Sequence, residues 1–118
     1  MPLNIKQLGC TDYINTWEDM KYFIDQAPIQ DELWITEHQP IFTTGVNKKN
    51  CLIPDTDIPH LFVDRGGKIT YHGPGQLIIY TLINIKKNNL MIRQLVSILE
   101  NSVIDFLKKN KINSYSKI

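Results

Sequence analysis

The sequence predicts an α+β fold with a mainly antiparallel sheet and flanking helices. Five β-prone segments follow one another between residues 32 and 85, mostly with short connections, as neighbouring antiparallel strands do. A sixth segment begins the chain, and an amphipathic helix lies on each side of the run of five. The chain has 118 residues, a length that suits one domain, so we expect 1–118 to form a single domain.

The N-terminal part of the chain predicts a strand followed by a helix. Residues 2–8 (PLNIKQL) form the strand, and Thr11 or Asp12 offers an N-cap for the helix. The helix is expected to end before Pro28. Four apolar side chains recur at steps of four, three and four and define its buried face: Tyr13, Trp17, Met20 and Ile24.

The middle of the chain predicts three strands and a loop. Residues 32–38 and 41–45 form two strands, because Pro40 interrupts the ladder between them. The polar stretch 46–59 is a loop, and 60–64 (HLFVD) is the next strand.

The C-terminal half predicts two further strands and the clearest helix. Residues 68–72 (KITYH) and 76–85 (QLIIYTLINI) are the strands, and the second is apolar enough to be covered on both faces. Helix 89–110 follows, and the β-prone segment KINSYSKI ends the sequence. The helix carries an apolar stripe at helical spacing: Ile92, Leu95, Val96, Leu99, Val103, Phe106 and Leu107.

Composition and charge exclude several classes of function. The net charge is +1, which gives no global basis for binding nucleic acid or an anionic membrane. No signal peptide is apparent, and the longest apolar stretch, 77–85, is too short to span a bilayer, so we expect a cytoplasmic protein. Cys10 and Cys51 are then reduced thiols, and without a Cys/His cluster no metal site is expected.

Residues 65–76 (RGGKITYHGPGQ) contain four of the six glycines and allow two interpretations. In the structural one, Gly66-Gly67 forms a two-residue hairpin turn between strands 60–64 and 68–72. Residues 73–75 then form a second reversal of the chain. The charged side chains of Arg65 and Lys68, on either side of the first turn, are then solvated.

In the functional interpretation, the same segment is one wall of a small-molecule site. Glycines let a ligand approach the main chain closely, and Arg65 suits a carboxylate or phosphate. In an extended strand Thr70 and His72 share one face, whereas Ile69 and Tyr71 share the other. No phosphate-binding loop motif is present in the sequence.

The stretch DRGGKITYHGPGQLIIY (64–80) resembles the signature of the octanoyltransferases of lipoate biosynthesis, also called lipoyl(octanoyl) transferases. Segments 8–20, 33–45 and 93–107 resemble that family in the same order, so the resemblance covers almost the whole chain. It implies a biotin/lipoate-protein ligase-like (class II synthetase-like) fold, here C-terminally truncated. Lipoate-protein ligases differ in having three glycines after an arginine pair and a His-Asp pair, where this chain has two glycines and His72-Gly73.

The resemblance implies transfer of an octanoyl group from octanoyl-acyl carrier protein to a lysine of a lipoyl domain, with no cofactor. The acceptors would be the lipoyl domains of 2-oxoacid dehydrogenases and the glycine cleavage H protein. The family uses a cysteine as acyl acceptor and a lysine that lowers its pKa. Neither family motif occurs in this sequence, so Cys10, Cys51 and Lys117 receive no catalytic role.

By the same resemblance, one segment lines the acyl pocket, and Ile69 or Tyr71 is expected to flank the aliphatic chain. His72 either bonds near the acyl carbonyl or holds the following turn, which Gln76 helps to orient. His38 is expected to pack and hydrogen-bond near the same sheet, and His60 to lie at the surface. The expected substrate-binding residues are Arg65, Gly66, Gly67, Lys68, Ile69, Thr70, Tyr71 and His72.

Three functional hypotheses remain. In the first, the chain is an octanoyltransferase whose activity needs the missing C-terminal segment, supplied by a second polypeptide or by the intact gene, and the 118 residues alone are inactive. In the second, it is an inactive remnant or an acyl-binding module. The third, a small unrelated interaction domain, is disfavoured by the extended resemblance, and a lipoate-protein ligase-like protein is disfavoured by the glycine pattern.

Overall fold

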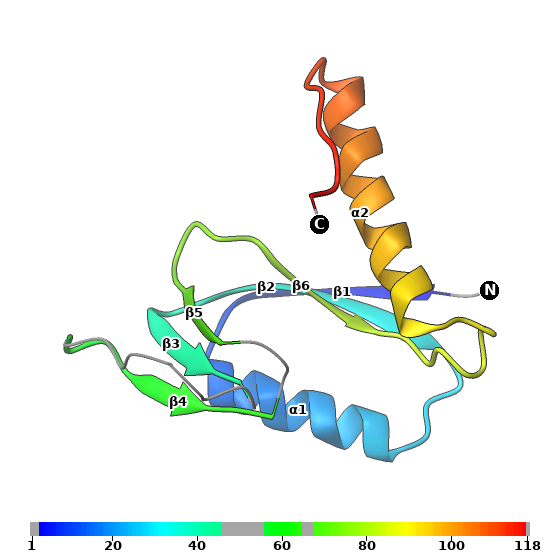
Figure 1. Ribbon diagram of the computed structural model, residues 1–118. Coiled ribbons are helices and arrows are strands. Elements are labelled where there is room, and N and C mark those ends of the chain that lie inside the picture. The colour runs from blue at the N-terminus through cyan, green and yellow to red at the C-terminus, as the bar shows by residue number, and fades with distance from the viewer. Residues whose placement is uncertain (1–2, 46–55, 65–67, 118) are drawn as a thin grey trace. The chain divides into compact units, whose positions relative to one another are not determined.

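The computed structural model describes residues 3–45, 56–64 and 68–117, and every element predicted from the sequence is present (Figure 1). The chain divides into two compact units, residues 1–83 and 84–118. The elements are β1 (Leu3–Thr11), α1 (Tyr13–Asp25), β2 (Asp31–His38), β3 (Ile41–Thr44), β4 (His60–Phe62), β5 (Ile69–His72), β6 (Ile78–Leu82) and α2 (Ile92–Lys109).

The first unit contains two three-stranded sheets, with strand orders β1-β2-β6 and β4-β3-β5. Each sheet combines one antiparallel pair, β2–β6 or β3–β5, with one parallel pair, β1–β2 or β3–β4. The α+β class predicted from the sequence is confirmed.

The order of the second sheet contradicts a hairpin at Gly66-Gly67. Strand β3 lies between β4 and β5 and bonds to both, so β4 and β5 are not neighbours. A two-residue hairpin requires its two strands to be adjacent, which makes that expectation wrong. Residues 65–67 themselves lie outside the described part of the chain.

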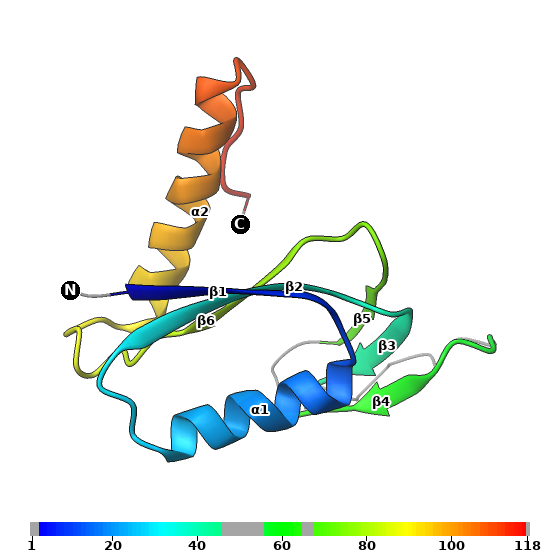
Figure 2. The same ribbon diagram turned by 180° about the vertical axis from the view of Figure 1, so that it is seen from behind.

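Helix α1 begins where the sequence predicts and packs against the first sheet (Figure 2). The carboxylate of Asp12 caps it by accepting a hydrogen bond from the Asn15 amide at 3.0 Å. Near the other end of the helix, the ring of Phe23 lies edge-on to that of Trp34 on β2, with centroids 5.8 Å apart.

A small apolar core joins α1 to the second sheet. The buried side chains of Tyr13, Ile41 and Val63 pack together, with Trp17 and Leu61 against them. Tyr13 and Trp17 belong to the helix face that the sequence predicts to be buried, and this part of the face meets β3 and the end of β4. The prediction is wrong for Ile24 in the last turn, which is 57% exposed.

Strand β2 buries every second side chain, and one of these is a carboxylate. Glu32 is 7% exposed. It accepts hydrogen bonds from Trp34 Nε1 at 2.8 Å and Asn4 Nδ2 at 3.0 Å, and Lys6 Nζ lies 3.3 Å away. Burial alone raises the pKa of Glu32, but the three donors and the lysine charge outweigh it and lower the pKa below its ordinary value.

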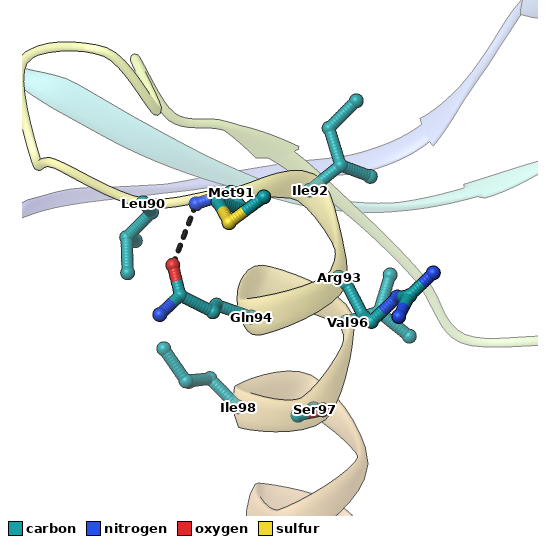
Figure 3. Close-up of a pocket in the computed structure, with 8 residues that line it drawn as sticks. All are labelled: Leu90, Met91, Ile92, Arg93, Gln94, Val96, Ser97 and Ile98. Carbon is teal, nitrogen blue, oxygen red and sulfur yellow. Dashed lines mark hydrogen bonds between the residues drawn. The ribbon is translucent and has the colours of Figure 1, made fainter.

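The second unit consists of turns followed by α2, and the structure leaves none of the described α2 side chains buried. The Gln94 side-chain oxygen accepts a hydrogen bond from the Met91 amide at 2.7 Å and so fixes the start of the helix (Figure 3). Along the predicted stripe, Ile92 is 69%, Val103 57% and Phe106 65% exposed. Within the described residues, neither helix has the length and apolar character needed to cross a membrane.

We predict that Glu32→Gln lowers stability at neutral pH and weakens its dependence on acid. A carboxyl group with a lowered folded-state pKa stabilises the fold above its unfolded-state pKa of about 4, and this contribution is lost as the pH falls through the folded-state value. Urea unfolding from pH 7 to pH 3 should therefore give a shallower acid decline for the variant. Glu18→Gln, at an exposed position of α1, is the control; equal declines for Glu32→Gln and wild type would contradict the prediction.

Candidate functional site

Four aromatic and histidine side chains from four different elements gather where the two sheets meet α1. We call this group the Tyr–His cluster: Tyr13 of α1, His38 of β2, His72 of β5 and Tyr80 of β6. The Tyr13 ring stacks on His72 with centroids 5.6 Å apart and an interplanar angle of 18°, and lies edge-on to His38 at 5.2 Å. His38 lies 6.1 Å from His72 and 5.8 Å from Tyr80.

His38 is fully buried, and its hydrogen bonds determine its tautomer. Its Nδ1 lies 2.8 Å from the carbonyl oxygen of Thr11, which only accepts, so Nδ1 carries the proton. In the neutral ring Nε2 is then an acceptor, and the Tyr80 hydroxyl donates to it at 2.8 Å. The expectation that His38 is a packing and hydrogen-bonding residue is confirmed.

Tyr80 is suited to this donor role. Burial, and next the nearby Tyr13, raise the pKa of Tyr80 well above its ordinary value. The phenol therefore keeps its proton over the whole physiological range and donates continuously to His38.

Buried threonines hold the backbone around His38 in place. The Thr36 hydroxyl donates to the Gly9 carbonyl at 2.7 Å and lies 2.7 Å from the Thr11 hydroxyl. Thr16 at the start of α1 donates to Thr11 Oγ1 at 2.9 Å. The end of β1, the start of α1 and the end of β2 thus share one hydrogen-bonded network beside the Tyr–His cluster.

His72 is oriented by the turn that follows β5. Its Nδ1 lies 3.3 Å from the side-chain oxygen of Gln76. The backbone N–H of Gln76 donates to the Gly73 carbonyl at 3.2 Å. Pro74 at the second position and Gly75 with φ +86° at the third are the pattern of a type II turn. This contact is compatible with one of the two expected roles, in which His72 holds the turn, and the other role, at an acyl carbonyl, stays a prediction.

The alternation expected along β5 is confirmed. His72 lies opposite Ile41, whose side chain is in the core, and Tyr71 lies opposite Phe42, with ring centroids 5.2 Å apart. A Cβ at Gly73 would lie 2.7 Å from Cζ of Tyr71, so only glycine leaves room for this ring.

Just before the predicted acyl-binding residues, α1 anchors the chain through Asp64. Trp17 Nε1 donates to this carboxylate at 3.1 Å, and Lys21 Nζ lies 3.3 Å from its other oxygen. Lys21 also lies over the Trp17 ring, 3.9 Å from its centroid. Desolvation beside α1 raises the pKa of the exposed Asp64, but the bonds from Lys21 and Trp17 lower it by more, so its pKa lies below the ordinary value.

The structure describes five of the eight expected substrate-binding residues. Lys68 and Thr70 are exposed, Ile69 is half-buried and Tyr71 is 42% exposed, all on or beside β5 with His72. The other three, Arg65, Gly66 and Gly67, lie outside the described residues.

Sequence reasoning did not assign Tyr13 and Tyr80 to a site. Both side chains are largely buried, and a buried tyrosine hydroxyl needs a hydrogen-bond partner, which is the signal that could have pointed to them. His60 was expected at the surface. It is half-buried instead, because its Nε2 lies 2.6 Å from the hydroxyl of buried Thr44. Cys10 is a free thiol, as expected, and lies exposed at 3.3 Å from Gln39 Nε2.

Comparison with known proteins identifies the family. The sequence model of the lipoyl protein ligase A/B catalytic domain matches residues 12–117. The chain belongs to this family. The resemblance to the octanoyltransferases and the lipoate-protein ligase-like fold that it implies are thereby confirmed.

Curated members of the family give a more specific similarity. The chain is 50% identical over 118 residues to an octanoyltransferase of Shewanella frigidimarina. It is 47% identical to one of Shewanella oneidensis and 45% identical to one of Pseudoalteromonas atlantica. Each alignment covers 98% of this chain but 54–55% of the relative, so the chain spans about half the length of the relatives it matches.

We predict that Tyr80→Phe lowers the free energy of unfolding by about 1–3 kcal/mol, because it leaves Nε2 of buried His38 without its donor. Tyr22→Phe is the matched control, since the Tyr22 side chain is 69% exposed on α1. Urea unfolding at pH 7 measures both variants. Equal stabilities for the two would show that the His38–Tyr80 bond contributes nothing measurable.

Proposed function

We propose that the chain is the acyl-binding part of an octanoyltransferase. The full reaction moves an octanoyl group from octanoyl-acyl carrier protein to a lysine of lipoyl domains, in the cytoplasm and without a cofactor. The observation that carries the proposal is the 45–50% identity to octanoyltransferases along 98% of this chain. The acceptors would be lipoyl domains of 2-oxoacid dehydrogenases and the glycine cleavage H protein.

The geometry of β5 supports an acyl wall. Ile69 and Tyr71 share the strand face that meets Phe42 and Thr44, and they present apolar surface that suits an aliphatic chain. His72 faces the Tyr–His cluster on the other side, where its imidazole would orient the acyl carbonyl. Arg65, Gly66, Gly67, Lys68 and Thr70 complete the proposed wall.

Octanoyl transfer also needs a reactive cysteine and its lysine, which the proposed wall does not contain. A thiolate attacks the octanoyl thioester and releases the carrier thiol, and a lysine amine then displaces the enzyme thiol to form the amide. The family motifs for the acyl cysteine and its lysine do not occur in residues 1–118. We therefore propose that these residues alone do not transfer octanoyl groups. The alternative is an acyl-binding module without activity.

A chimera tests the wall. Residues 1–118 are joined to the remaining C-terminal part of the Shewanella frigidimarina octanoyltransferase, and octanoylation of a lipoyl domain is followed by its mass. Ile69→Arg should reduce the rate at least about 100-fold, because it places a charge against the aliphatic chain. Ile24→Arg, the same change at a 57% exposed position of α1, should leave the rate unchanged.

Two results of the chimera test would count against the proposal. Equal rates for Ile69→Arg and Ile24→Arg would remove β5 from the acyl site. A chimera that folds and binds octanoyl-acyl carrier protein without transfer would favour the acyl-binding module.

We also propose that the apolar stripe of α2 receives the remaining half of the protein. The stripe exposes Leu99, Val103 and Phe106, with Leu99 39% exposed, and such contiguous apolar surface marks an interaction site. The relatives are nearly twice as long as this chain, so their uncovered part is the polypeptide that fits the role. It would come either as a second chain or as a continuation of this one.

Expression in trans tests this surface. The C-terminal part of the Shewanella frigidimarina relative, produced as a separate polypeptide, should bind the 118-residue chain and restore transfer. Val103→Glu should weaken binding at least about tenfold, because it buries a charge at the interface. Asn101→Glu, on the polar side of α2, is the control; equal binding by the two variants, measured by calorimetry, would contradict the assignment.

A further inference from the structure

The end of β2 sends two neighbouring side chains to opposite sides of the sheet. His38 points to the α1 side, where it joins the Tyr–His cluster. Glu37 therefore points to the other side, because successive side chains of a strand alternate. There its Oε1 accepts a hydrogen bond from the backbone amide of Gly75 at 2.5 Å.

This contact continues the pairing of two strands that have already separated. The ladder between β2 and β6 ends at the pair Thr36–Ile78, so the backbone from Glu37 onward bonds to no residue of β6 in the register. Gly75 lies three residues before Ile78 and belongs to the turn that connects the two sheets. A side-chain carboxylate thus replaces the missing backbone partner and joins the turn to the end of β2.

The Gly73–Gln76 turn determines where the His72 imidazole points. Gly75 and Gln76 are adjacent in the turn, and the Gln76 side-chain oxygen accepts from His72 Nδ1 at 3.3 Å. An amide oxygen cannot donate, so this bond selects the tautomer of His72 that carries its proton on Nδ1 and its lone pair on Nε2. A shift of the turn would move Gln76 and weaken that selection.

We propose that Glu37 is a positioning residue for His72: its carboxylate holds the Gly73–Gln76 turn, and the turn holds the imidazole in one tautomer. Both Glu37 and Gly75 are accessible to solvent, so the bond adds little to global stability. Its effect is on geometry, since a charged acceptor on a backbone amide is among the stronger hydrogen bonds. The consequence for octanoyl transfer rests on the function proposed above.

Nitrogen-15 NMR of the histidine side chains in the 118-residue chain tests the positioning directly. In the wild type, neutral His72 should carry its proton on Nδ1. Glu37→Ala should raise the share of the Nε2–H form, because the Gln76 oxygen then accepts less from Nδ1. Glu37→Gln should keep the wild-type form, because its amide oxygen still accepts from Gly75, and Glu18→Ala controls for the loss of an exposed carboxylate.

His38 is an internal control for folding. It should keep its Nδ1–H form in every variant, because Thr11 and Tyr80 hold it independently of Glu37. An unchanged His72 tautomer in a folded Glu37→Ala variant would overturn the proposal. So would a Glu37→Gln variant that behaves like Glu37→Ala.

The chimera separates positioning from function. There, Glu37→Ala should lower kcat about tenfold with little change in KM for octanoyl-acyl carrier protein, as expected for a misplaced group that acts during the reaction. A chimera without any transfer would refute the proposed function and leave the NMR result standing. A normal kcat beside a changed tautomer would refute the role of the His72 tautomer in transfer.

Discussion

The buried face of β2 is the constraint on which the rest of the first unit depends. Three of its four buried side chains are polar, Glu32, Thr36 and His38, and a buried polar group without a partner costs more than a typical hydrogen bond contributes. Each finds its partners on another element. Glu32 is bonded from β1, Thr36 bonds to the backbone of β1, and His38 bonds to Thr11 and to Tyr80 of β6.

The two ends of β2 meet this requirement with different kinds of partner. Near Glu32 the partners are Trp34, Asn4 and Lys6, which give two hydrogen bonds and an ion pair within β1 and β2. The hydrogen-bond partners of His38, Thr11 and Tyr80, both belong to the first sheet. Contact with the second sheet comes from the ring of Tyr13, which lies edge-on to His38 and stacks on His72.

The second unit presents the opposite situation. Helix α2 has a well-patterned apolar stripe, yet none of its described side chains is buried. Helical periodicity requires only local spacing, whereas burial requires a surface of matching shape. The helix is therefore specified by its own residues, and its apolar stripe is the surface for which we propose the remaining half of the relatives as partner.

Much of this protein follows from its sequence alone. All eight elements were predictable, because a period of two or of 3.6 residues and the caps and prolines at the ends are local properties of the chain. The alternation along β5 followed for the same reason, and so did the family, because its motifs are contiguous segments. The packing and hydrogen-bonding role of His38 was also predicted from the sequence.

Tertiary structure alone decided which strands are neighbours and which side chains meet. The insertion of β3 between β4 and β5 overturned the hairpin that Gly66-Gly67 suggested, since adjacency in sequence does not require adjacency in a sheet. The Tyr–His cluster joins positions from 13 to 80, and no local pattern encodes such a contact. The need to pair buried polar groups across elements places the Tyr80 hydroxyl on His38. The turn before β6 brings the Gly75 amide to the solvent-accessible carboxylate of Glu37, a contact that also depends on the tertiary structure.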